Sequence, residues 1–360
     1  MKNMLVTGGA GFIGSNFVHY YRKARPDVNL VVLDALTYAG NRANLAALEG
    51  QPGFTFVEGN ICDEALVTRL LEKHDIDTLV HFAAESHVDR SITGPDAFIE
   101  TNIIGTHALL KAARKVWTAR GGFDGRRFHH VSTDEVYGTL KPQDPAFSET
   151  TPYAPNSPYA ASKASSDHLV RAYHHTFGLP VTTSNCSNNY GPFQFPEKLL
   201  PLCLLNILHG KPLPIYGDGQ QIRDWLHVDD HNRGISLVFE KGTLGETYNI
   251  GGNNEWANLD TVKLLCSIVD QCFAEDSELA RRFPASPSAR GEQSENLVTF
   301  VTDRPGHDTR YAINAGKITH DLGYQPQVSF SEGLRQTVQW YLQNQQWWET
   351  LLARHKASDK

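Results

Sequence analysis

The sequence predicts an α/β protein built on a Rossmann-type, doubly wound parallel sheet. Apolar runs of strand length recur through its first half, at residues 4–6, 30–33, 54–57, 78–82 and 128–132. Helical patterns separate these runs, and strands that alternate with helices form right-handed crossovers in a parallel sheet. Polar residues follow several of the runs, at the edge where open α/β sheets bind ligands.

The regular alternation of strands and helices does not continue to the end of the chain. Helical periodicity is clear over 97–117 and 159–177, and a further strand is expected at 181–185. Beyond residue 193, prolines and glycines interrupt the alternation of strands and helices. We therefore predict a Rossmann domain over 1–192 and a smaller C-terminal α/β domain over 193–360. Residues 247–250 are expected to return to the sheet, and the charged, Ser- and Pro-rich segment 274–298 to form a surface excursion.

Composition excludes several classes of protein. The 360 residues are 40% hydrophobic and 20% charged, as in ordinary globular proteins. A formal charge of −7 without a basic stripe argues against a nucleic-acid partner. The five cysteines are scattered and form no Cys-x-x-Cys pair, so we expect neither disulfides nor a metal site. A strand begins within a few residues of the N-terminus and no apolar run could cross a bilayer, so we expect a cytoplasmic protein.

A glycine-rich turn joins the first apolar run to the first helix. Gly8, Gly11 and Gly14 allow a tight turn, close approach of a pyrophosphate to the backbone and close packing of helix on strand. The phosphate then meets free N–H groups at the positive end of the helix dipole. Asp34 ends the second run and is suited to bind ribose hydroxyls. Because no arginine follows Asp34 directly, we expect NAD rather than NADP.

Two motifs further along carry acid–base chemistry. Thr133, Asp134 and Glu135 place two carboxylic acids beside a hydroxyl at the end of a buried strand. Such a pair can supply one proton acid and one proton base, as elimination of water requires. Tyr159 and Lys163 share one face of a helix, so the ammonium can favour a phenolate base during hydride transfer. Together the motifs indicate a redox-assisted dehydratase.

These motifs resemble those of a known family. The glycine turn with Tyr-x-x-x-Lys resembles the extended short-chain dehydrogenase/reductase superfamily. Within it, six segments are similar to the dTDP-glucose 4,6-dehydratase family, and they are 81–91, 132–138, 187–192, 196–199, 221–225 and 303–307. The Thr-Asp-Glu triplet discriminates best, because related sugar-nucleotide epimerases typically lack the acidic pair. The resemblance spans nearly the whole chain.

The resemblance implies an NAD-dependent hydro-lyase that converts dTDP-glucose to dTDP-4-keto-6-deoxyglucose. Tyr159, assisted by Thr133, would take the proton of the sugar 4-hydroxyl while the C4 hydride passes to NAD. Glu135 would remove the C5 proton and Asp134 would protonate the departing C6 hydroxyl, after which the hydride returns to C6. Asp134 must be protonated for this role, which Glu135 and burial would favour. Lys163 would also hold the nicotinamide ribose.

The resemblance also assigns residues to the two ligands and implies a homodimer, because the helices bearing Thr101 and Tyr159 commonly pair across a two-fold axis. One departure is Asn60, where Asp is more typical, but Asn can still hydrogen-bond adenine. Lys198, Arg223 and Arg304 suit a diphosphate. Besides the glycines, the cofactor set is Phe12, Ile13, Asp34, Asn60, Ile61, Ala83, Ala84, Thr101, Tyr159, Lys163 and Asn189. The substrate set is Ser86, Thr133, Asn188, Glu197, Lys198, Pro214, Tyr216, Arg223, Asn258, Arg304 and His307.

Three alternatives stay open at this point. The substrate could be another nucleotide sugar such as UDP- or CDP-glucose, because contacts to the base are hard to place. An epimerase needs Tyr159 and Lys163 but has no use for Asp134 and Glu135. A non-catalytic NAD-binding sensor or scaffold would tend to lose the tyrosine and the lysine, and both are present.

Overall fold

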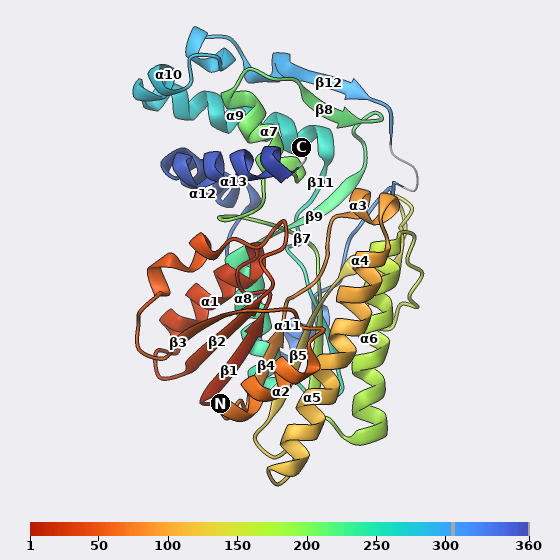
Figure 1. Cartoon of the computed structure of the whole chain (residues 1–360). Helices are drawn as coiled ribbons and strands as arrows, with labels where there is room; N and C mark the ends of the chain where they lie inside the picture. The colour runs from red at the N-terminus through yellow and green to blue at the C-terminus, as the bar shows by residue number, and fades with distance from the viewer. Residues whose placement is uncertain (304–306, 359–360) are drawn as a thin grey trace.

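The computed structural model describes residues 1–303 and 307–358, and its main element is a seven-stranded parallel sheet (Figure 1). The strand order is β10-β6-β5-β4-β1-β2-β3, and each neighbouring pair is parallel. The connections reverse direction between β1 and β4, which confirms the predicted doubly wound sheet. The strands are β1 (Asn3–Thr7), β2 (Asn29–Asp34), β3 (Phe54–Glu58), β4 (Thr78–His81), β5 (Arg127–Thr133), β6 (Val181–Cys186) and β10 (Thr247–Ile250).

Helices cover both faces of this sheet. Met4 and Val6 of β1 lie in one apolar core with helices α1, α8 and α11, and Leu5 lies in the opposite core with α2, α5 and α6. Because the central strands are buried on both faces, they are continuous apolar runs in the sequence rather than alternating ones. These helices are α1 (Phe12–Ala24), α2 (Glu64–Lys73), α5 (Thr106–Ala119), α6 (Pro158–Phe177), α8 (Val228–Lys241) and α11 (Gly316–Leu322).

A separate apolar core lies beyond the carboxyl ends of the sheet strands, in the upper part of Figure 1. It gathers Leu204, Trp225, Val262 and Phe330 from distant parts of the chain. Two small sheets, β11-β9-β7 and β12-β8, border it. Its helices are α7 (Leu199–Leu208), α9 (Asn258–Glu275), α10 (Glu278–Arg282), α12 (Phe330–Gln343) and α13 (Gln345–Ser358), and the strands are β7 (Asn188–Tyr190), β8 (Leu213–Tyr216), β9 (Ile222–His227), β11 (Glu255–Ala257) and β12 (Val298–Val301).

The chain crosses between the two parts more than once. After β9 it returns to the large sheet, where α8 contributes Phe239 and β10 contributes Tyr248 to the first core. The segment 274–298 packs Phe283 into the second core, and the Asp270 carboxylate accepts hydrogen bonds from Ser288 and Ser294. This excursion is therefore pinned to α9 and leads directly into β12.

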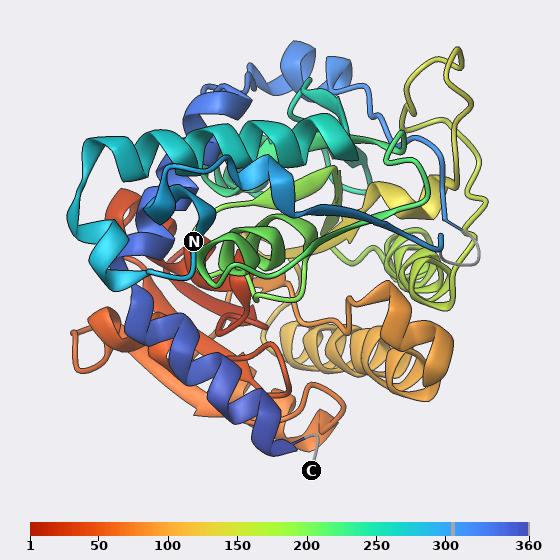
Figure 2. The ribbon, with the colours of Figure 1, turned by 90° about the horizontal axis from the view of Figure 1, so that it is seen from above.

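The C-terminal helices contact the start of the chain. Figure 2 shows α13 lying over the N-terminal part of the sheet, where Trp347 Nε1 donates to Asn44 Oδ1 at 2.7 Å. Asn44 Nδ2 in turn donates to the carbonyl of Ala10 at 2.9 Å, within the glycine turn. Trp340 packs against Phe193 with ring centroids 4.8 Å apart. The C-terminal tryptophans thus contact two segments near the sheet edge. Trp347 contacts Asn44, and Trp340 contacts Phe193.

The remaining short elements lie along that edge. The expected single helix over 97–117 is divided, because a π-helical stretch, η2, interrupts it before α5. Across the described residues, no helix combines the length and apolar character that crossing a membrane requires. The short elements are η1 (Arg42–Leu48), α3 (Val88–Thr93), α4 (Asp96–Phe98), η2 (Ile99–Gly105), η3 (Asp134–Tyr137), η4 (Pro287–Arg290) and η5 (Ser294–Leu297).

Candidate active site

A cavity of about 510 Å³ lies between the carboxyl edge of the large sheet and the second core. Its wall includes every residue that the sequence assigned to the cofactor, the substrate or the chemistry, apart from Arg304, which lies outside the described residues. The position is the switch point of the doubly wound sheet, where the loops after β1 and β4 diverge. The volume is in the range of small-molecule sites.

The glycine turn forms one end of the cavity. Gly8 has φ +70°, and a β-carbon there would overlap the backbone of Ala83, which follows β4. A β-carbon on Gly14 would overlap the carbonyl of Gly8. Helix α1 begins at Phe12 after Gly11, so no side chain at the N-cap occupies its first N–H groups. The turn therefore presents bare backbone donors and a helix N-terminus to the cavity, a fit for a pyrophosphate.

Asp34 holds this turn in place from the end of β2. Its Oδ2 atom accepts from the N–H of Ala10 at 2.9 Å, and its Oδ1 atom accepts from the N–H of Leu36 at 2.8 Å. The side chain is buried, and burial raises the pKa of the carboxyl while these two hydrogen bonds oppose the shift. Asp34 lines the cavity together with Asn60 and Ile61, so its carboxylate is placed to accept hydrogen bonds from a ligand.

The acidic pair follows β5 directly. Thr133 ends the strand and caps η3, where its hydroxyl accepts from the N–H of Glu135 at 3.3 Å. This turn sends two adjacent carboxyls into different environments, because Asp134 is 2% exposed whereas Glu135 is half-buried. Both line the cavity.

Burial raises the pKa of Asp134 well above its usual range. Glu135 and Asp224 raise it further, and Arg223 and the Thr133 hydroxyl oppose the shift. Among the residues that the structure describes, no hydrogen-bond partner meets Asp134 Oδ2. These shifts favour the protonated form of Asp134, and its Oδ2 atom is placed to donate the proton.

Helix α6 carries Tyr159 and Lys163 to the same wall. The Ser157 hydroxyl caps the helix by accepting from the N–H of Ala160 at 3.1 Å, and Pro158 starts the first turn. Tyr159 lies one turn before Lys163, and both are buried. The Lys163 ammonium donates to the carbonyl of Val131 at 2.8 Å.

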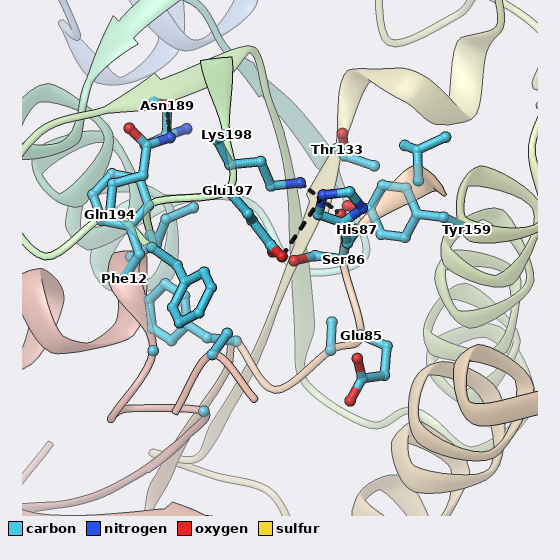
Figure 3. A pocket seen from close by; sticks show the side chains of 18 of the residues that line it. Phe12, Glu85, Ser86, His87, Thr133, Tyr159, Asn189, Gln194, Glu197 and Lys198 are labelled. Carbon is cyan, nitrogen blue, oxygen red and sulfur yellow. Dashed lines mark hydrogen bonds and ion pairs between the residues drawn. The ribbon is translucent and has the colours of Figure 1, made fainter. Parts of the chain in front are cut away.

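A side-chain hydrogen bond with Thr133 lowers the pKa of the Tyr159 phenol, and Figure 3 shows both residues on the same side of the cavity. Burial and the negative charge of Glu135 raise the pKa by more, so the protein alone favours the protonated phenol. Tyr159 can therefore act as a base only if positive charge nearby stabilises the phenolate. The Lys163 ammonium can supply such a charge, and so can a cationic ring such as oxidised nicotinamide.

Polar contacts cross the cavity from the opposite side (Figure 3). Glu197 Oε2 lies 3.4 Å from the Arg90 guanidinium and 3.7 Å from His87 Nε2. The Lys198 ammonium donates to the carbonyl of Ser86 at 3.2 Å. These contacts join the loop before α7 to the loop and helix that follow β4, and they place a lysine where a diphosphate could lie.

The far end of the cavity is built by short strands of the second core. Tyr216 of β8 is 41% exposed, and its ring lies edge-on to His307 with centroids 6.0 Å apart. His307 Nδ1 is 2.6 Å from Asp303 Oδ1. Arg223 donates to the carbonyl of Asp308 at 3.0 Å and lies over the Tyr311 ring.

The remaining assigned residues lie between these groups. The Asn60 side chain accepts from the N–H of Cys62 at 2.9 Å. Asn189 Oδ1 is 2.9 Å from Nδ1 of the buried His231. The other members of the cavity wall are Phe12, Ile13, Ala83, Ala84, Thr101, Asn188, Pro214 and Asn258.

Sequence reasoning missed several side chains on the wall. Tyr311 is buried next to Glu135 and Arg223, and its hydroxyl donates to the Asp308 carboxylate. Cys186 ends β6 beside Asp134 and Lys163, and Gln194 borders the glycine-turn end. Only the position of Cys186 at a strand end could have been read from the sequence, because the other two follow irregular segments.

Two adjacent histidines of β5 have a structural setting. His129 and His130 are buried in β5, where burial lowers the pKa of each imidazole well below its usual range. His130 Nε2 lies 3.0 Å from the Asp167 carboxylate. Within the described ranges, no group of three or more His, Cys, Asp or Glu side chains is placed to hold a metal ion.

Comparison with known proteins identifies the family. Residues 5–337 match the family described as GDP-mannose 4,6 dehydratase. The chain is 55% identical to dTDP-glucose 4,6-dehydratase of Xanthomonas campestris pv. campestris over 98% of this chain and 96% of that one. It is 54% identical to the dTDP-glucose 4,6-dehydratase of Salmonella typhimurium, over 96% and 94% of the two chains.

A solved structure gives the same result. DesIV, the dTDP-glucose 4,6-dehydratase of Streptomyces venezuelae solved with NAD and TYD bound, is 49% identical. It superposes with a TM-score of 0.84 over 97% of this chain and 99% of that one. The chain belongs to the dTDP-glucose 4,6-dehydratase family, within the extended short-chain dehydrogenase/reductase superfamily.

Proposed function

We propose that this chain dehydrates dTDP-glucose to dTDP-4-keto-6-deoxyglucose with NAD as a recycled cofactor. The observation that carries the proposal is the unequal acidic pair. Asp134 is buried, with a raised pKa that favours the protonated carboxyl, and it lies next to a half-buried Glu135 on the same cavity wall. Water elimination needs one acid and one base at neighbouring atoms of the substrate, and this pair can supply both.

The residues at the glycine turn fit NAD. The bare backbone of residues 8–14 and the start of α1 would hold the pyrophosphate, and Asp34 would bind the adenosine ribose. Asn60, Ile61, Ala83, Ala84 and Thr101 would enclose the adenine and its ribose. Bound NAD would supply the chemistry that side chains lack, by accepting the C4 hydride of the sugar and later returning it to C6.

The buried wall would carry out the proton transfers. Tyr159 would take the proton of the 4-hydroxyl, with the Thr133 hydroxyl orienting the phenol. The Lys163 ammonium would stabilise the phenolate and hold the nicotinamide ribose. Glu135 would then remove the C5 proton, which a 4-ketone acidifies, while Asp134 would protonate the departing C6 hydroxyl.

We infer a division of labour along the chain. Residues 1–192 would chiefly bind the cofactor, and residues 193–360 would mainly bind the nucleotide sugar. Lys198 and Arg223 would contact the diphosphate, Tyr216 the base, and Glu197, Asn258 and His307 the remaining polar groups. Support comes from the presence of all these residues on the wall of the cavity.

We further propose a homodimer that uses the helices bearing Thr101 and Tyr159. Ile92, Ile99, Ile104 and Phe177 are large apolar residues on α3, η2 and α6 with between 38% and 46% of their surface exposed. A second copy placed on this face would cover them. Light scattering on the purified chain should give twice the chain mass, and a monomer at micromolar concentration would refute this state.

The function is tested by incubating the purified protein separately with dTDP-, UDP- and CDP-glucose, with NAD or NADP. The expected result is a 4-keto-6-deoxy product, seen by NMR, from dTDP-glucose with NAD. Turnover of UDP- or CDP-glucose instead would change the substrate, and a C4 epimer would change the reaction. Absence of any product would favour a non-catalytic NAD-binding role.

A further inference from the structure

Asp167 is a buried carboxylate that the proposed chemistry does not use, and it lies on the same helix as Tyr159 and Lys163 without lining the cavity. Asp167 is four residues after Lys163 on α6, so the two side chains project from the same face of the helix. It is 6% exposed, and it faces β5, the strand that ends in Thr133. A buried charge at such a position is costly unless it has partners.

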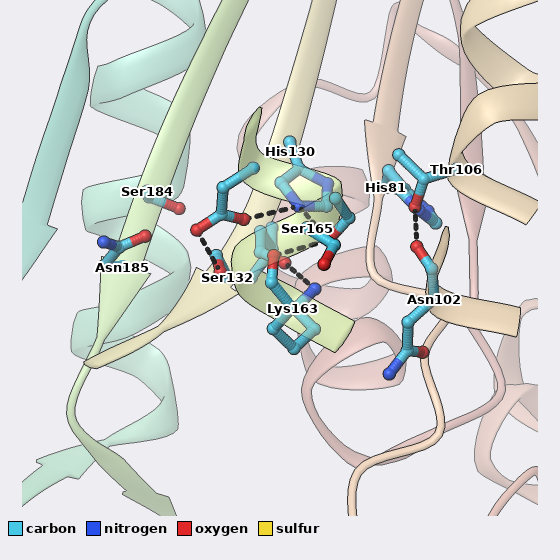
Figure 4. Close-up of polar contacts among 12 residues, drawn as sticks. His81, Asn102, Thr106, His130, Ser132, Lys163, Ser165, Ser184 and Asn185 are labelled. Carbon is cyan, nitrogen blue, oxygen red and sulfur yellow. Dashed lines mark hydrogen bonds and ion pairs between the residues drawn. The ribbon is translucent and has the colours of Figure 1, made fainter. Parts of the chain in front are cut away.

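Three hydrogen-bonding groups surround this carboxylate. Ser132 Oγ donates at 2.9 Å and the Tyr153 hydroxyl donates at 3.0 Å, both to Oδ2. His130 Nε2 lies 3.0 Å from Oδ1, and Figure 4 shows His130, Ser132 and Lys163 close together. The partners come from β5 and from the segment before α6, so Asp167 links the strand and the helix that carry the reacting groups.

The network extends away from the cavity as well. Asn185 of β6 donates to the hydroxyls of Tyr153 and Tyr137, at 3.3 and 3.0 Å. The Tyr137 hydroxyl donates to Asn249 Oδ1 at 2.9 Å, and Glu149 accepts from the N–H of Asn249 at 2.9 Å. These groups fix Asp167 in place without supplying a cation.

Lys163 and Asp167 face neighbouring residues of β5, where Lys163 donates to the carbonyl of Val131 and Asp167 accepts from Ser132 Oγ. Asp167 raises the pKa of Lys163 more than Cys186, the other group that raises it, while burial lowers the pKa. His81, His129 and His130 are kept neutral by burial, so they contribute no cation that could satisfy Asp167 in place of the lysine. Glu135 raises the pKa of Tyr159, and His168 lowers the pKa of the Asp167 carboxyl less than Lys163 does.

We propose that Asp167 is a positioning residue for the reaction, a buried counter-ion that keeps Lys163 in its ammonium form beside Tyr159. The inference rests on the proposed function, because it matters only if Tyr159 works as a base. A neutral Lys163 could still donate to Val131, but it could not stabilise a phenolate. Asp167 would thus affect the reaction indirectly, because it favours the charged form of Lys163, which in turn stabilises the phenolate of Tyr159.

Burial raises the pKa of Asp167 to about 6, with Lys163, Ser132 and Tyr153 opposing the shift. The carboxylate is therefore ionised at neutral pH and becomes protonated as the pH falls through 6. Its support for the ammonium is present above that pH and is lost below it.

The test replaces the charge but keeps the shape. In Asp167→Asn, Lys163 loses its counter-ion and deprotonates at lower pH, so the alkaline limb of the kcat–pH profile should move down by about one unit. At neutral pH kcat should fall about tenfold, while KM for dTDP-glucose stays the same because Asp167 does not line the cavity. The matched control is Tyr153→Phe, which removes one hydrogen bond to the same oxygen and leaves the charge.

The control should keep the alkaline limb of the wild-type protein. If both variants lower kcat alike with no shift of the limb, Asp167 is merely structural and the proposal is wrong. A wild-type profile in Asp167→Asn would overturn it as well.

A second measurement does not depend on turnover or on a folded Asp167→Asn single variant. Lys163→Met leaves the Asp167 charge alone in the interior, and adding Asp167→Asn removes it. Urea unfolding should show the double variant to be more stable than Lys163→Met, and the reverse order would refute the charge pairing. If the wild-type protein turns over no nucleotide sugar, the proposed function fails, whereas this stability comparison still tests the pair.

Discussion

The two sides of the cavity are built in contrasting ways. The floor, formed by Thr133, Asp134, Tyr159 and Lys163, comes from the end of one sheet strand and the first turns of one helix. The roof, formed by Glu197, Lys198, Tyr216 and His307, comes from loops and a four-residue strand. Asp134 and Lys163 are 2% and 4% exposed, whereas Tyr216 is 41% exposed.

This difference separates chemistry from binding. Burial shifts the pKa of the floor residues and holds their geometry, so they suit proton transfer. Of the roof residues Tyr216 is exposed, and Glu197, Lys198 and His307 are half-buried. They carry charged and aromatic groups on loops and a short strand, so they suit recognition of a diphosphate and a base. Changes in the floor should therefore act on kcat, and changes in the roof should act on KM.

The largest expected effect is on the floor. Tyr159→Phe removes the base for the 4-hydroxyl, so kcat should fall by about 10³-fold while NAD stays bound. Single-turnover absorbance of the reduced cofactor measures the step directly. Tyr173→Phe, at the other end of the same helix, is the control and should behave as the wild-type protein. Turnover by Tyr159→Phe within a few-fold of wild type would contradict the division between floor and roof.

The next effect concerns the cofactor end of the cavity. Asp34 is buried and held by the N–H of Ala10. If it binds the adenosine ribose as proposed, the 2′-phosphate of NADP would meet a carboxylate that cannot move into water. Contact between the Asp34 carboxylate and the negatively charged 2′-phosphate would cost several kcal/mol, so NADP should bind about 100-fold more weakly than NAD. Calorimetry on cofactor-free protein gives both affinities, and equal values would refute the assignment of Asp34.

How much the sequence could predict follows the same contrast. The glycine turn, Asp34 and the Thr133 triplet could be placed because each follows a buried strand, and parallel strands bring their carboxyl ends to one edge. Asp167 could not be distinguished from a solvated residue, because it stands in a polar stretch of its helix. Its burial depends on β5 and on Tyr153, which lie elsewhere in the sequence.

The less regular parts were harder to foresee. The π-helical η2 turns Asn102 inward, where it hydrogen-bonds Ser162 and the backbone of Glu85. Those partners are tertiary contacts, so periodicity alone predicted a continuous helix. Tyr311 reaches the cavity after an irregular segment, held by isolated bridges to β9 and to Phe147 rather than by a strand of its own. No local sequence pattern indicates that Tyr311 lies on the cavity wall.

A smaller effect should come from the roof. Lys198→Met removes a cation that is placed for the diphosphate, so KM for dTDP-glucose should rise about tenfold with kcat nearly unchanged. Lys211→Met, at an exposed lysine just beyond α7, should leave both constants as they are. A loss confined to kcat in Lys198→Met would place the lysine with the floor instead.

The smallest effect is on stability and has a definite sign. The pKa of Asp134 is raised in the folded state, so the folded protein binds a proton that the unfolded chain releases, and this carboxyl destabilises the fold as the pH rises. Asp134→Asn removes that cost, so at pH 8 the melting temperature should increase by about a degree or two. The gain should shrink as the pH falls towards 4. A lower melting temperature at pH 8 would mean that Asp134 is ionised and paired.

The unequal acidic pair is tested most directly by solvent deuterium at C5 of the sugar. Wild-type protein, Asp134→Asn and Glu135→Gln are each incubated with dTDP-glucose in deuterated water, and the sugars are analysed by NMR and mass spectrometry. The wild type should give a 4-keto-6-deoxy product with deuterium at C5. Asp134→Asn should still exchange C5 but release little 6-deoxy product, and Glu135→Gln should block the exchange. Unimpaired exchange in Glu135→Gln, or its loss in Asp134→Asn, would contradict the assignment of base and acid.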